Sequence, residues 1–224
     1  TFGLRLAEYD TYSPGVGATP AVDPSTGAVF FPTSQFFDEI LPDFTGWAWF
    51  DTVPGDKSSP ALSPDGAAVY VGIANGAGNA NSGLRAYRTR AGGNSGATAV
   101  RLWHALQGTE IKSSPAVDTS GNIYVGTRGS GFVSLNPSNG SIRWTWAESN
   151  WIDSSPALGP IGSGGAQLVV FGVGGIGSGK IVALNTSNGS VAWQVTAPTG
   201  GCNGSPGIGS DGTVYIGCDD GYLY

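Results

Sequence analysis

The sequence predicts an all-β protein, a β-propeller of about five four-stranded antiparallel blades that form one domain over residues 1–224. Three observations support this prediction: a block repeated five times, a composition rich in turn residues, and few charges. Glycine (38) and proline (14) supply 52 of the 224 residues, and only 12% of the chain is charged, which disfavours long helices. Hydrophobic residues at 40% still suffice for a core, so the composition indicates short strands joined by frequent turns.

The repeated block carries an anchor proline in the motif S-S-P-A or a close variant. The anchors are Pro20, Pro60, Pro115, Pro156 and Pro206. Their spacings of 40, 55, 41 and 50 residues match the period of four-stranded propeller blades. Each block reads as a strand, a glycine-containing turn and a second strand rich in β-branched and aromatic residues.

A second half follows each block and supplies the third and fourth strands, as in 131–146 and 179–195. We expect Asn139-Gly140 and Asn188-Gly189 to be two-residue hairpin turns between these strands. Trp103, Trp144 and Trp193 occupy matching places before the next anchor proline. One large ring per blade is typical of packing between radially repeated sheets, so we assign these tryptophans to packing and not to catalysis.

The two ends of the chain complement each other. The last block stops at Tyr224, after its third strand, whereas residues 3–9 form an orphan strand ahead of the first block. If these segments paired, the N-terminal strand would complete the last blade and close a five-bladed ring without an exposed edge. The alternative is that five blades are part of a larger propeller.

The pattern SSPAV, turn, IYVG, G-x-V-x-x-L-N, x-x-N-G, x-x-x-W resembles the pyrroloquinoline quinone (PQQ)-like repeat of quinoprotein alcohol dehydrogenases and of the outer-membrane assembly lipoprotein scaffold. The resemblance runs from Pro20 to Tyr224 and is strongest at 113–146 and 154–194. It implies a propeller, but the family includes both enzymes and protein-docking scaffolds. Its enzymes hold the quinone over adjacent cysteines and bind calcium through Glu, Asn and Asp. Neither set can be placed on this chain, so we expect no catalytic residues, no PQQ, no calcium and no other metal site.

Other motifs favour structural interpretations. The stretch 171–180, FGVGGIGSGK, contains G-x-G-x-x-G and a P-loop-like G-x-x-x-x-G-K, but the repeat predicts a strand after it, where phosphate binding needs a helix. His104 is the only histidine, which limits metal sites and base-assisted nucleophiles. The Asp-rich turns are Asx turns, with calcium at one of them as the alternative. Asp38 with Glu39, or Asp51 with Asp56, are carboxylate pairs that a glycosidase could use, although chance pairs are expected among 16 acids.

Two cysteines, Cys202 and Cys218, bracket an apparent hairpin. One antiparallel register would set them opposite each other, with Ser205 opposite Tyr215, which predicts a cross-strand disulfide; two buried thiols are the alternative. Four N-x-S/T sequons are candidates for glycosylation: Asn139, Asn185, Asn188 and Asn203. With the low charge and the lack of methionine, these features suggest a mature secreted or extracellular chain, or a periplasmic one.

The charge balance bears on partners. A net charge of −6 with only 10 Lys and Arg argues against binding of nucleic acid or an anionic membrane. No run approaches 18 uninterrupted apolar residues, so the sequence predicts no membrane span.

Propeller geometry predicts the binding face. Loops that enter the first strand of a blade and loops between its second and third strands should open on the same face of the propeller. The longer loops 33–43, 73–83 and 173–179 should lie on this face. We expect this face to carry Lys57, Lys112, Asp153, Asn203 and Trp151, together with the loop aromatics Phe36 and Phe37. Large rings on a rigid scaffold are good anchors for a sugar ring or a protein, although local packing would also explain them. Thr19, Ser59, Ser114, Ser155 and Ser205 should ring the channel.

These observations favour a non-enzymatic scaffold that mediates protein or glycan contacts. The alternatives are a fragment of a PQQ-dependent oxidoreductase whose catalytic residues lie in other blades, and a structural subunit of an extracellular filament or assembly, in which an open blade edge is completed by a neighbour.

Overall fold

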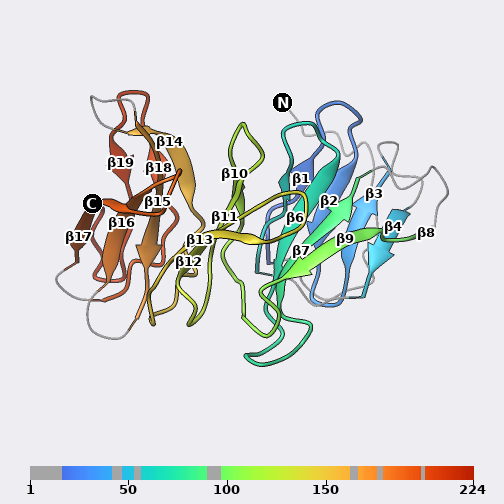
Figure 1. Ribbon diagram of the computed structural model, residues 1–224, viewed down its shortest axis with the longest axis horizontal. Helices are drawn as coiled ribbons and strands as arrows, with labels where there is room; N and C mark the ends of the chain where they lie inside the picture. The colour runs from blue at the N-terminus through green and yellow to red at the C-terminus, as the bar shows by residue number, and fades with distance from the viewer. Residues whose placement is uncertain are drawn as a thin grey trace, which may run out of the picture.

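The computed structural model describes residues 17–41, 47–52, 57–89, 97–161, 166–175, 179–197 and 200–224. Within these ranges the chain is all-β, as predicted, and contains no helix that could span a bilayer. Its strands form five sheets, which we call blades 1 to 5 in chain order (Figure 1). The predicted strand at 3–9 and Asp56 lie outside the described residues.

Blades 2, 3 and 4 are four-stranded antiparallel sheets in simple sequence order. Blade 2 contains β5 (Ala61–Leu62), β6 (Ala68–Ile73), β7 (Gly83–Arg88) and β9 (Arg101–Ala105). Blade 3 contains β10 (Ala116–Val117), β11 (Ile123–Gly126), β12 (Phe132–Leu135) and β13 (Ile142–Trp146). Blade 4 contains β14 (Ala157–Ile161), β15 (Ala166–Val173), β16 (Lys180–Asn185) and β17 (Val191–Thr196).

The first and last blades differ from this pattern. Blade 1 contains β1 (Ala21–Val22), β2 (Val29–Pro32), β3 (Phe37–Ile40) and β4 (Trp47–Asp51), and β8 (Ala97–Thr98) adds a fifth, parallel strand along β4. Blade 5 contains β18 (Gly207–Ile208) and β19 (Val214–Tyr215), after which 216–218 pairs back with 222–224. The anchor prolines therefore precede the first strand of each blade, as the repeat predicts.

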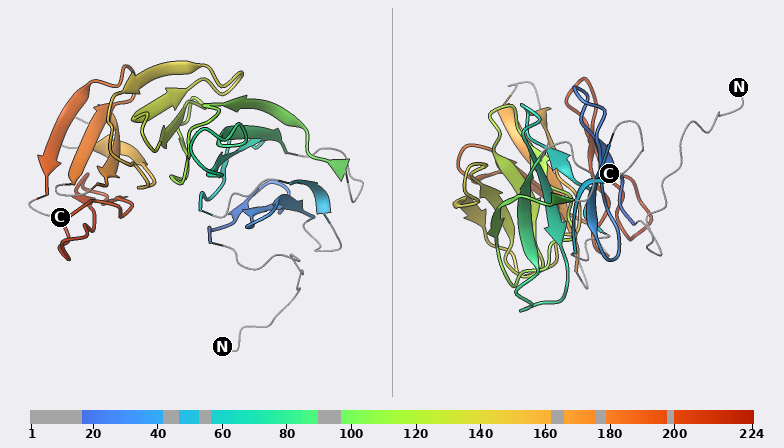
Figure 2. Two further views of the ribbon diagram at one scale, coloured as in Figure 1. Left: turned by 90° about the horizontal axis from the view of Figure 1, so that it is seen from below. Right: turned by 90° about the vertical axis from the view of Figure 1, so that its right-hand side faces the viewer.

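The blades follow one another along an open arc, with blade 1 at one end and blade 5 at the other (Figure 2). The innermost strands of blades 2 to 5 contact their neighbours in order. A chain of hydrogen bonds joins them: in each case the backbone N–H of the residue before one anchor proline donates to the hydroxyl at the same place in the next blade. The donors are Thr19, Ser59, Ser114 and Ser155, and the acceptors are Ser59, Ser114, Ser155 and Ser205, at 2.9–3.1 Å. The serine hydroxyls before the anchor prolines thus link adjacent blades by hydrogen bonds.

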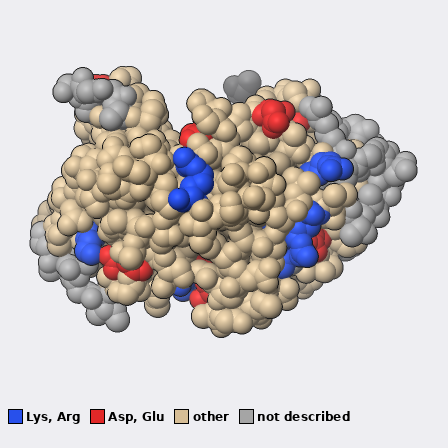
Figure 3. Space-filling model, viewed as in Figure 1, with Lys and Arg blue, Asp and Glu red and all other residues tan. Residues whose placement is uncertain are grey.

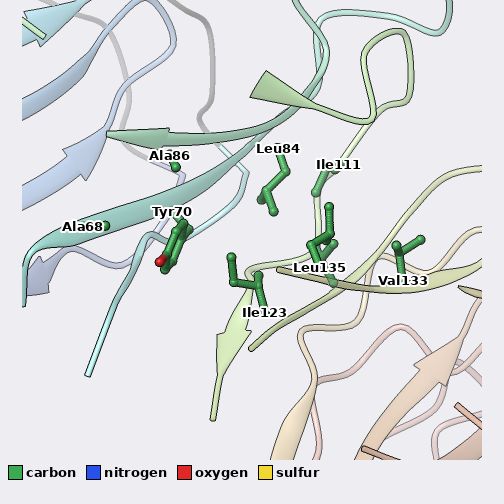
Figure 4. Close-up of a cluster of buried hydrophobic side chains, with 9 residues drawn as sticks. Ala68, Tyr70, Leu84, Ala86, Ile111, Ile123, Val133 and Leu135 are labelled. Atoms are coloured by element: carbon green, nitrogen blue, oxygen red, sulfur yellow. The ribbon is translucent and has the colours of Figure 1, made fainter. Parts of the chain in front are cut away.

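The core lies between blades and not in one central cluster. Between blades 2 and 3, Tyr70 and Leu84 meet Ile123 and Leu135, and all four side chains are at most 1% exposed (Figure 4). Similar clusters fill the other three interfaces. The middle strands of a blade are buried on both faces, so their apolar residues run nearly continuously, as in β6, where all six residues are buried.

The repeated tryptophans dock each blade onto the next. Trp103 and Trp144 donate their Nε1–H to the main-chain oxygens of Pro137 and Thr186, at 2.8 and 3.0 Å. Each ring covers the glycine of the following blade's turn: a Cβ at Gly189 would come within 2.5 Å of the Trp144 ring. The packing role predicted for these residues is confirmed.

The expected two-residue turns at Asn139-Gly140 and Asn188-Gly189 are wrong. In blade 3 the Asn136 N–H bonds to the Ser141 oxygen and the Gly140 N–H bonds to the Asn136 oxygen, which makes a four-residue loop; blade 4 repeats it. A two-residue type I′ turn needs positive φ at both central residues. Only Gly140, at φ 69°, has it, and Asn139 does not.

The predicted register of the last hairpin is also wrong, although its disulfide is present. Tyr215 pairs with Gly207, not with Ser205, because the turn is centred on Asp211, where the Gly209 N–H donates to the Thr213 oxygen. Cys202 and Cys218 nevertheless meet, with Cα atoms 4.2 Å apart.

Candidate functional site

Four segments lie together at one face of blades 3 to 5, which we call the loop face. They are the loop after β11, the segment between β13 and β14, the loop after β15 and the segment that enters blade 5. Backbone bonds place each segment that enters a blade beside the loop that follows its neighbour's second strand: Ile111 N–H to Ile73 O, Ile152 N–H to Thr127 O, and Cys202 N–H to Val173 O, at 3.0–3.3 Å. The two kinds of loop therefore share a face, as propeller geometry predicts.

Trp151 is the exposed aromatic of the loop face. Its side chain is 55% exposed, while its backbone is held on two sides, by a β-bridge with Arg128 and by the Gly174 N–H, which donates to the Trp151 oxygen at 2.8 Å. Its neighbour Ile152 is fully buried. The indole is thus an exposed ring on a fixed backbone, which lowers the entropy lost when a ligand binds.

An ion pair packs against one side of the indole. The Arg128 guanidinium stacks on the Trp151 ring with its carbon 4.4 Å from the centroid, and it donates through Nε and Nη2 to the two carboxylate oxygens of Asp153. The hydrogen bond with Asp153 raises the pKa of Arg128. This bidentate geometry fixes the guanidinium plane and with it the ring.

Asn203 reaches the same place from blade 5. Its Nδ2 donates to Asp219 Oδ2 at 2.7 Å. Asn203 directly follows Cys202, and Asp219 directly follows Cys218, so the disulfide brings the backbones of this pair together. A predicted structural bond therefore also positions a polar group of the site.

The loop at 148–150 closes the other side through Glu148. Its Oε2 accepts from Lys180 Nζ at 2.6 Å, and its Oε1 accepts from the backbone N–H groups of Ser149 and Asn150. Burial opposes ionisation of Glu148, but these hydrogen bonds outweigh it and lower the pKa. Lys180, the lysine of the P-loop-like motif, is the first residue of strand β16 and forms an ion pair with Glu148. The motif is therefore followed by a strand and not by a helix.

The glycines of that motif are explained by close packing. A side chain at Gly174 would collide with Asn203, and a Cβ at Gly175 would lie 2.9 Å from Asn150 Oδ1. Gly175 also has φ 137°, which strains any other residue. The glycine-rich pattern therefore lets blade 4 approach the asparagines.

Together these groups surround a cavity of about 370 Å³, lined by Ser149, Asn150, Trp151, Gly175 and Asn203. Of the predicted site residues, the structure brings together Trp151, Asp153 and Asn203. Sequence reasoning missed Arg128, Asn150 and Gly175. No sequence signal identified Arg128, because its partner Asp153 lies 25 residues away in another loop.

The remaining predicted residues lie elsewhere. Lys57 is exposed and Lys112 is half-buried, in the segments that enter blades 2 and 3. Phe36 is half-buried and packs edge-on against Phe50, with centroids 6.0 Å apart. Phe37 was assigned to the binding face, and this is wrong: it is fully buried in the core between blades 1 and 2, 5.3 Å from the Tyr87 ring, because β3 turns alternate side chains into the interface.

The four sequon asparagines are all near the surface. Asn139, Asn188 and Asn203 are exposed and Asn185 is half-buried. The side-chain amide nitrogen of Asn185 donates to Ser190, and that of Asn203 donates to Asp219. Attachment of a glycan at either position would replace one of the two amide hydrogens and leave a single N–H for these contacts.

The carboxylate pair Asp38 and Glu39 does not form a two-carboxylate site. The residues are neighbours on β3, so their side chains leave opposite faces of the sheet, and both are buried. Burial raises the pKa of Asp38 to about 7. In the part of the chain that the structure describes, no three His, Cys, Asp or Glu residues gather as a metal site.

His104 contributes to packing on β9. Its ring Nε2 lies 3.1 Å from the Ser82 oxygen. Burial lowers the pKa of His104, and the charge of Arg85 acts in the same direction.

Comparison with known proteins identifies the repeat. A family model described as "Outer membrane protein assembly factor BamB" matches residues 85–224, well over half of the chain. The chain belongs to this BamB family of PQQ-like propellers. The predicted PQQ-like fold is therefore confirmed, and the match begins in the third strand of blade 2.

A solved structure extends the likeness to blade 1. The chain is similar to the crystal structure of BamB from Moraxella catarrhalis, with a TM-score of 0.67 and 16% identity over 94% of this chain and 57% of that chain. The chain thus spans little more than half the length of that BamB. A search of curated proteins found no match. At 16% identity the structural likeness shows the fold alone.

Proposed function

We propose that this BamB-family propeller is a non-catalytic scaffold that binds a macromolecular partner at its loop face, with Trp151 as the anchor. The observation that carries the proposal is the exposed indole held by Arg128, Asp153 and Gly174. Holding an exposed tryptophan in one orientation costs conformational entropy, which a binding contact would offset. Tryptophan is also enriched among the residues that dominate binding energy.

Three features support a scaffold. The blades are joined by repeated hydrogen bonds and tryptophan contacts, which makes the loop face rigid. Charged side chains make up only 12% of the chain and are scattered over the face shown in Figure 3. The charges beside Trp151 pair with each other, so binding would depend on shape and polar contacts. The disulfide is typical of oxidising compartments, which is consistent with an extracellular or periplasmic scaffold; glycosylation of the sequons belongs to the extracellular case.

The test compares two side chains of equal exposure. Ile142 on β13 is 55% exposed, like Trp151, but it lies on an outer strand. Wild type, Trp151→Ala and Ile142→Ala would be immobilised and exposed to extract of the native source, and bound molecules would be quantified by mass spectrometry. We expect Trp151→Ala to lose a partner that wild type and Ile142→Ala both retain. Retention of every partner by Trp151→Ala would contradict the proposal.

The alternatives have their own tests. A fragment of a quinoprotein oxidoreductase would support quinone-dependent dye reduction when PQQ and calcium are added to the full-length protein. A subunit of an assembly would grow into larger particles with concentration, which light scattering would detect, whereas monomers throughout would contradict it.

A further inference from the structure

The cavity beside Trp151 combines an apolar ring with polar groups that carry no charge. Its lining consists of one indole, the amides of Asn150 and Asn203, the Ser149 hydroxyl and the backbone of Gly175. Such a lining offers a flat apolar surface together with hydrogen-bond donors and acceptors of both kinds. A matching ligand must have an apolar face and many neutral polar groups.

The charges around the cavity are already paired. Arg128 is bound by Asp153, and Lys180 is bound by Glu148. Asp219 accepts a hydrogen bond from Asn203 and, being acidic, disfavours anions. Among the residues that the structure describes, the cavity therefore offers no unpaired cation to a phosphate, sulfate or carboxylate, and a neutral ligand fits it better.

We propose that this cavity binds a neutral saccharide, so that the partner engaged by the loop face is a glycan. This inference rests on the proposed function and names the ligand class of the same site. A pyranose presents an apolar C–H face and a rim of hydroxyls, the combination that the lining requires. The cavity, at about 370 Å³, lies at the lower end of the range for small-ligand sites, about 300–1,000 Å³.

The contacts follow from the positions of the side chains. The exposed part of the Trp151 indole stacks on the C–H face of one sugar ring. The amides of Asn150 and Asn203 and the hydroxyl of Ser149 bond to its hydroxyls. Because Arg128 covers one side of the indole and Asp219 orients the Asn203 amide, little order has to be gained on binding.

Two structural bonds position the polar groups. The disulfide holds Asn203 beside Asp219, and the pair of Glu148 with Lys180 holds the backbone of Ser149 and Asn150. Glu148 and Cys218 are therefore positioning residues: they touch no ligand, but their loss should lower affinity.

The experiment titrates the folded, disulfide-bonded chain with neutral disaccharides of glucose, mannose, galactose and N-acetylglucosamine. The readouts are the ¹H–¹⁵N signal of the Trp151 indole, assigned by its loss in Trp151→Phe, and the backbone ¹H–¹⁵N signal of Gly175, which lines the same cavity and is kept by every variant. We expect at least one disaccharide to shift these signals in a saturable way with a Kd of about 1 mM.

The variants separate binding from folding. Measured by the Gly175 signal, Trp151→Ala should abolish the response, and Trp151→Phe, which keeps an aromatic face, should retain binding weakened by a few-fold. Asn203→Ala should weaken binding about tenfold, whereas Ile142→Ala should bind like wild type. Reduction of the disulfide should weaken binding while the spectrum of blades 2 and 3 stays dispersed.

Two results would overturn the inference. One is the lack of any saturable shift with all four neutral disaccharides up to about 50 mM, fifty times the expected Kd. The other is an N-glycan found on Asn203 by peptide mapping of the native protein, since its amide would then be substituted. Either result is combined with the capture experiment. If Trp151→Ala still loses the captured partner, the proposed scaffold function stands and the ligand is a peptide. If Trp151→Ala retains the partner, both proposals fail.

Discussion

The core of the interface between blades 3 and 4 is apolar, and its ion pairs, Arg128 with Asp153 and Lys180 with Glu148, lie at the loop face. The interface between blades 1 and 2 instead contains a buried arginine in an ion pair. In the first, Phe132 and Phe171 stack with centroids 3.9 Å apart and both are fully buried. In the second, Arg85 Nη1 lies 3.3 Å from Asp51 Oδ2, and the Tyr87 hydroxyl donates to the same oxygen at 2.7 Å. One repeated backbone thus accepts two kinds of interface.

The difference traces to one position of the third strand. The strand pairing places Asp38, Arg85, Val133 and Val182 opposite the same position of the second strand in blades 1 to 4. Blades 3 and 4 keep valine, and blade 2 has an arginine that must find a partner in blade 1. The lesson is that an apolar interface needs only volume, whereas a buried charge needs one specific neighbour.

Phe132→Ala should cause the largest loss of stability. Removal of a fully buried phenylalanine leaves a cavity between blades 3 and 4, at a cost of about 3–5 kcal/mol. Urea unfolding followed by tryptophan fluorescence would measure it, with exposed Ile142→Ala as control. A cost below that of the control would mean that the interface is not a main source of stability.

Asp51→Ala should come next, at about 2–4 kcal/mol. The change leaves the Arg85 guanidinium, which is 3% exposed, without its carboxylate, and the Tyr87 hydroxyl without its acceptor. Arg85→Val, which installs the residue of blades 3 and 4, should cost less, because the Asp51 side chain is 27% exposed and water can solvate it. Denaturant unfolding of both variants checks the order, and the reverse order would contradict this account.

Asp38→Asn should have an intermediate effect that depends on pH. Burial raises the pKa of Asp38 to about 7, so between about pH 4 and pH 7 the unfolded chain loses this proton while the folded chain keeps it. Stability should therefore fall as pH rises through this window, and it should fall no further above it. Melting temperatures should show Asp38→Asn unchanged at pH 4 and more stable by a few degrees at pH 8. A gain of equal size at both pH values would exclude this cause.

Trp144→Phe should have the smallest effect, about 1–2 kcal/mol. The ring remains over Gly189, but the hydrogen bond to the Thr186 oxygen is lost, which is worth about 1 kcal/mol. Trp103→Phe should cost a similar amount, because its bond to Pro137 has the same geometry. Thermal unfolding of both would test whether the two contacts are equivalent.

Much of the fold and part of the site could be predicted from residues close in sequence. The anchor prolines and glycine turns predicted the strand order, and the spacing of Trp103 and Trp144 predicted their packing. Trp151, Asp153 and Asn203 were placed on one face by the same repeat. Phe37 is predicted on the binding face but is buried, because the sequence does not show where strand β3 begins or which of its side chains point into the interface with the next blade.

The sequence by itself determined the class of fold, the order of the strands within a blade and the packing role of the repeated tryptophans, because these depend on a periodic pattern that repeats every 40 to 55 residues. Only the tertiary structure decided which side chains pair between blades, such as Arg85 with Asp51, and which groups surround Trp151. Those pairings depend on how adjacent sheets stagger and on where each loop turns. Such distances are set by the packed arrangement of many residues and not by any local pattern.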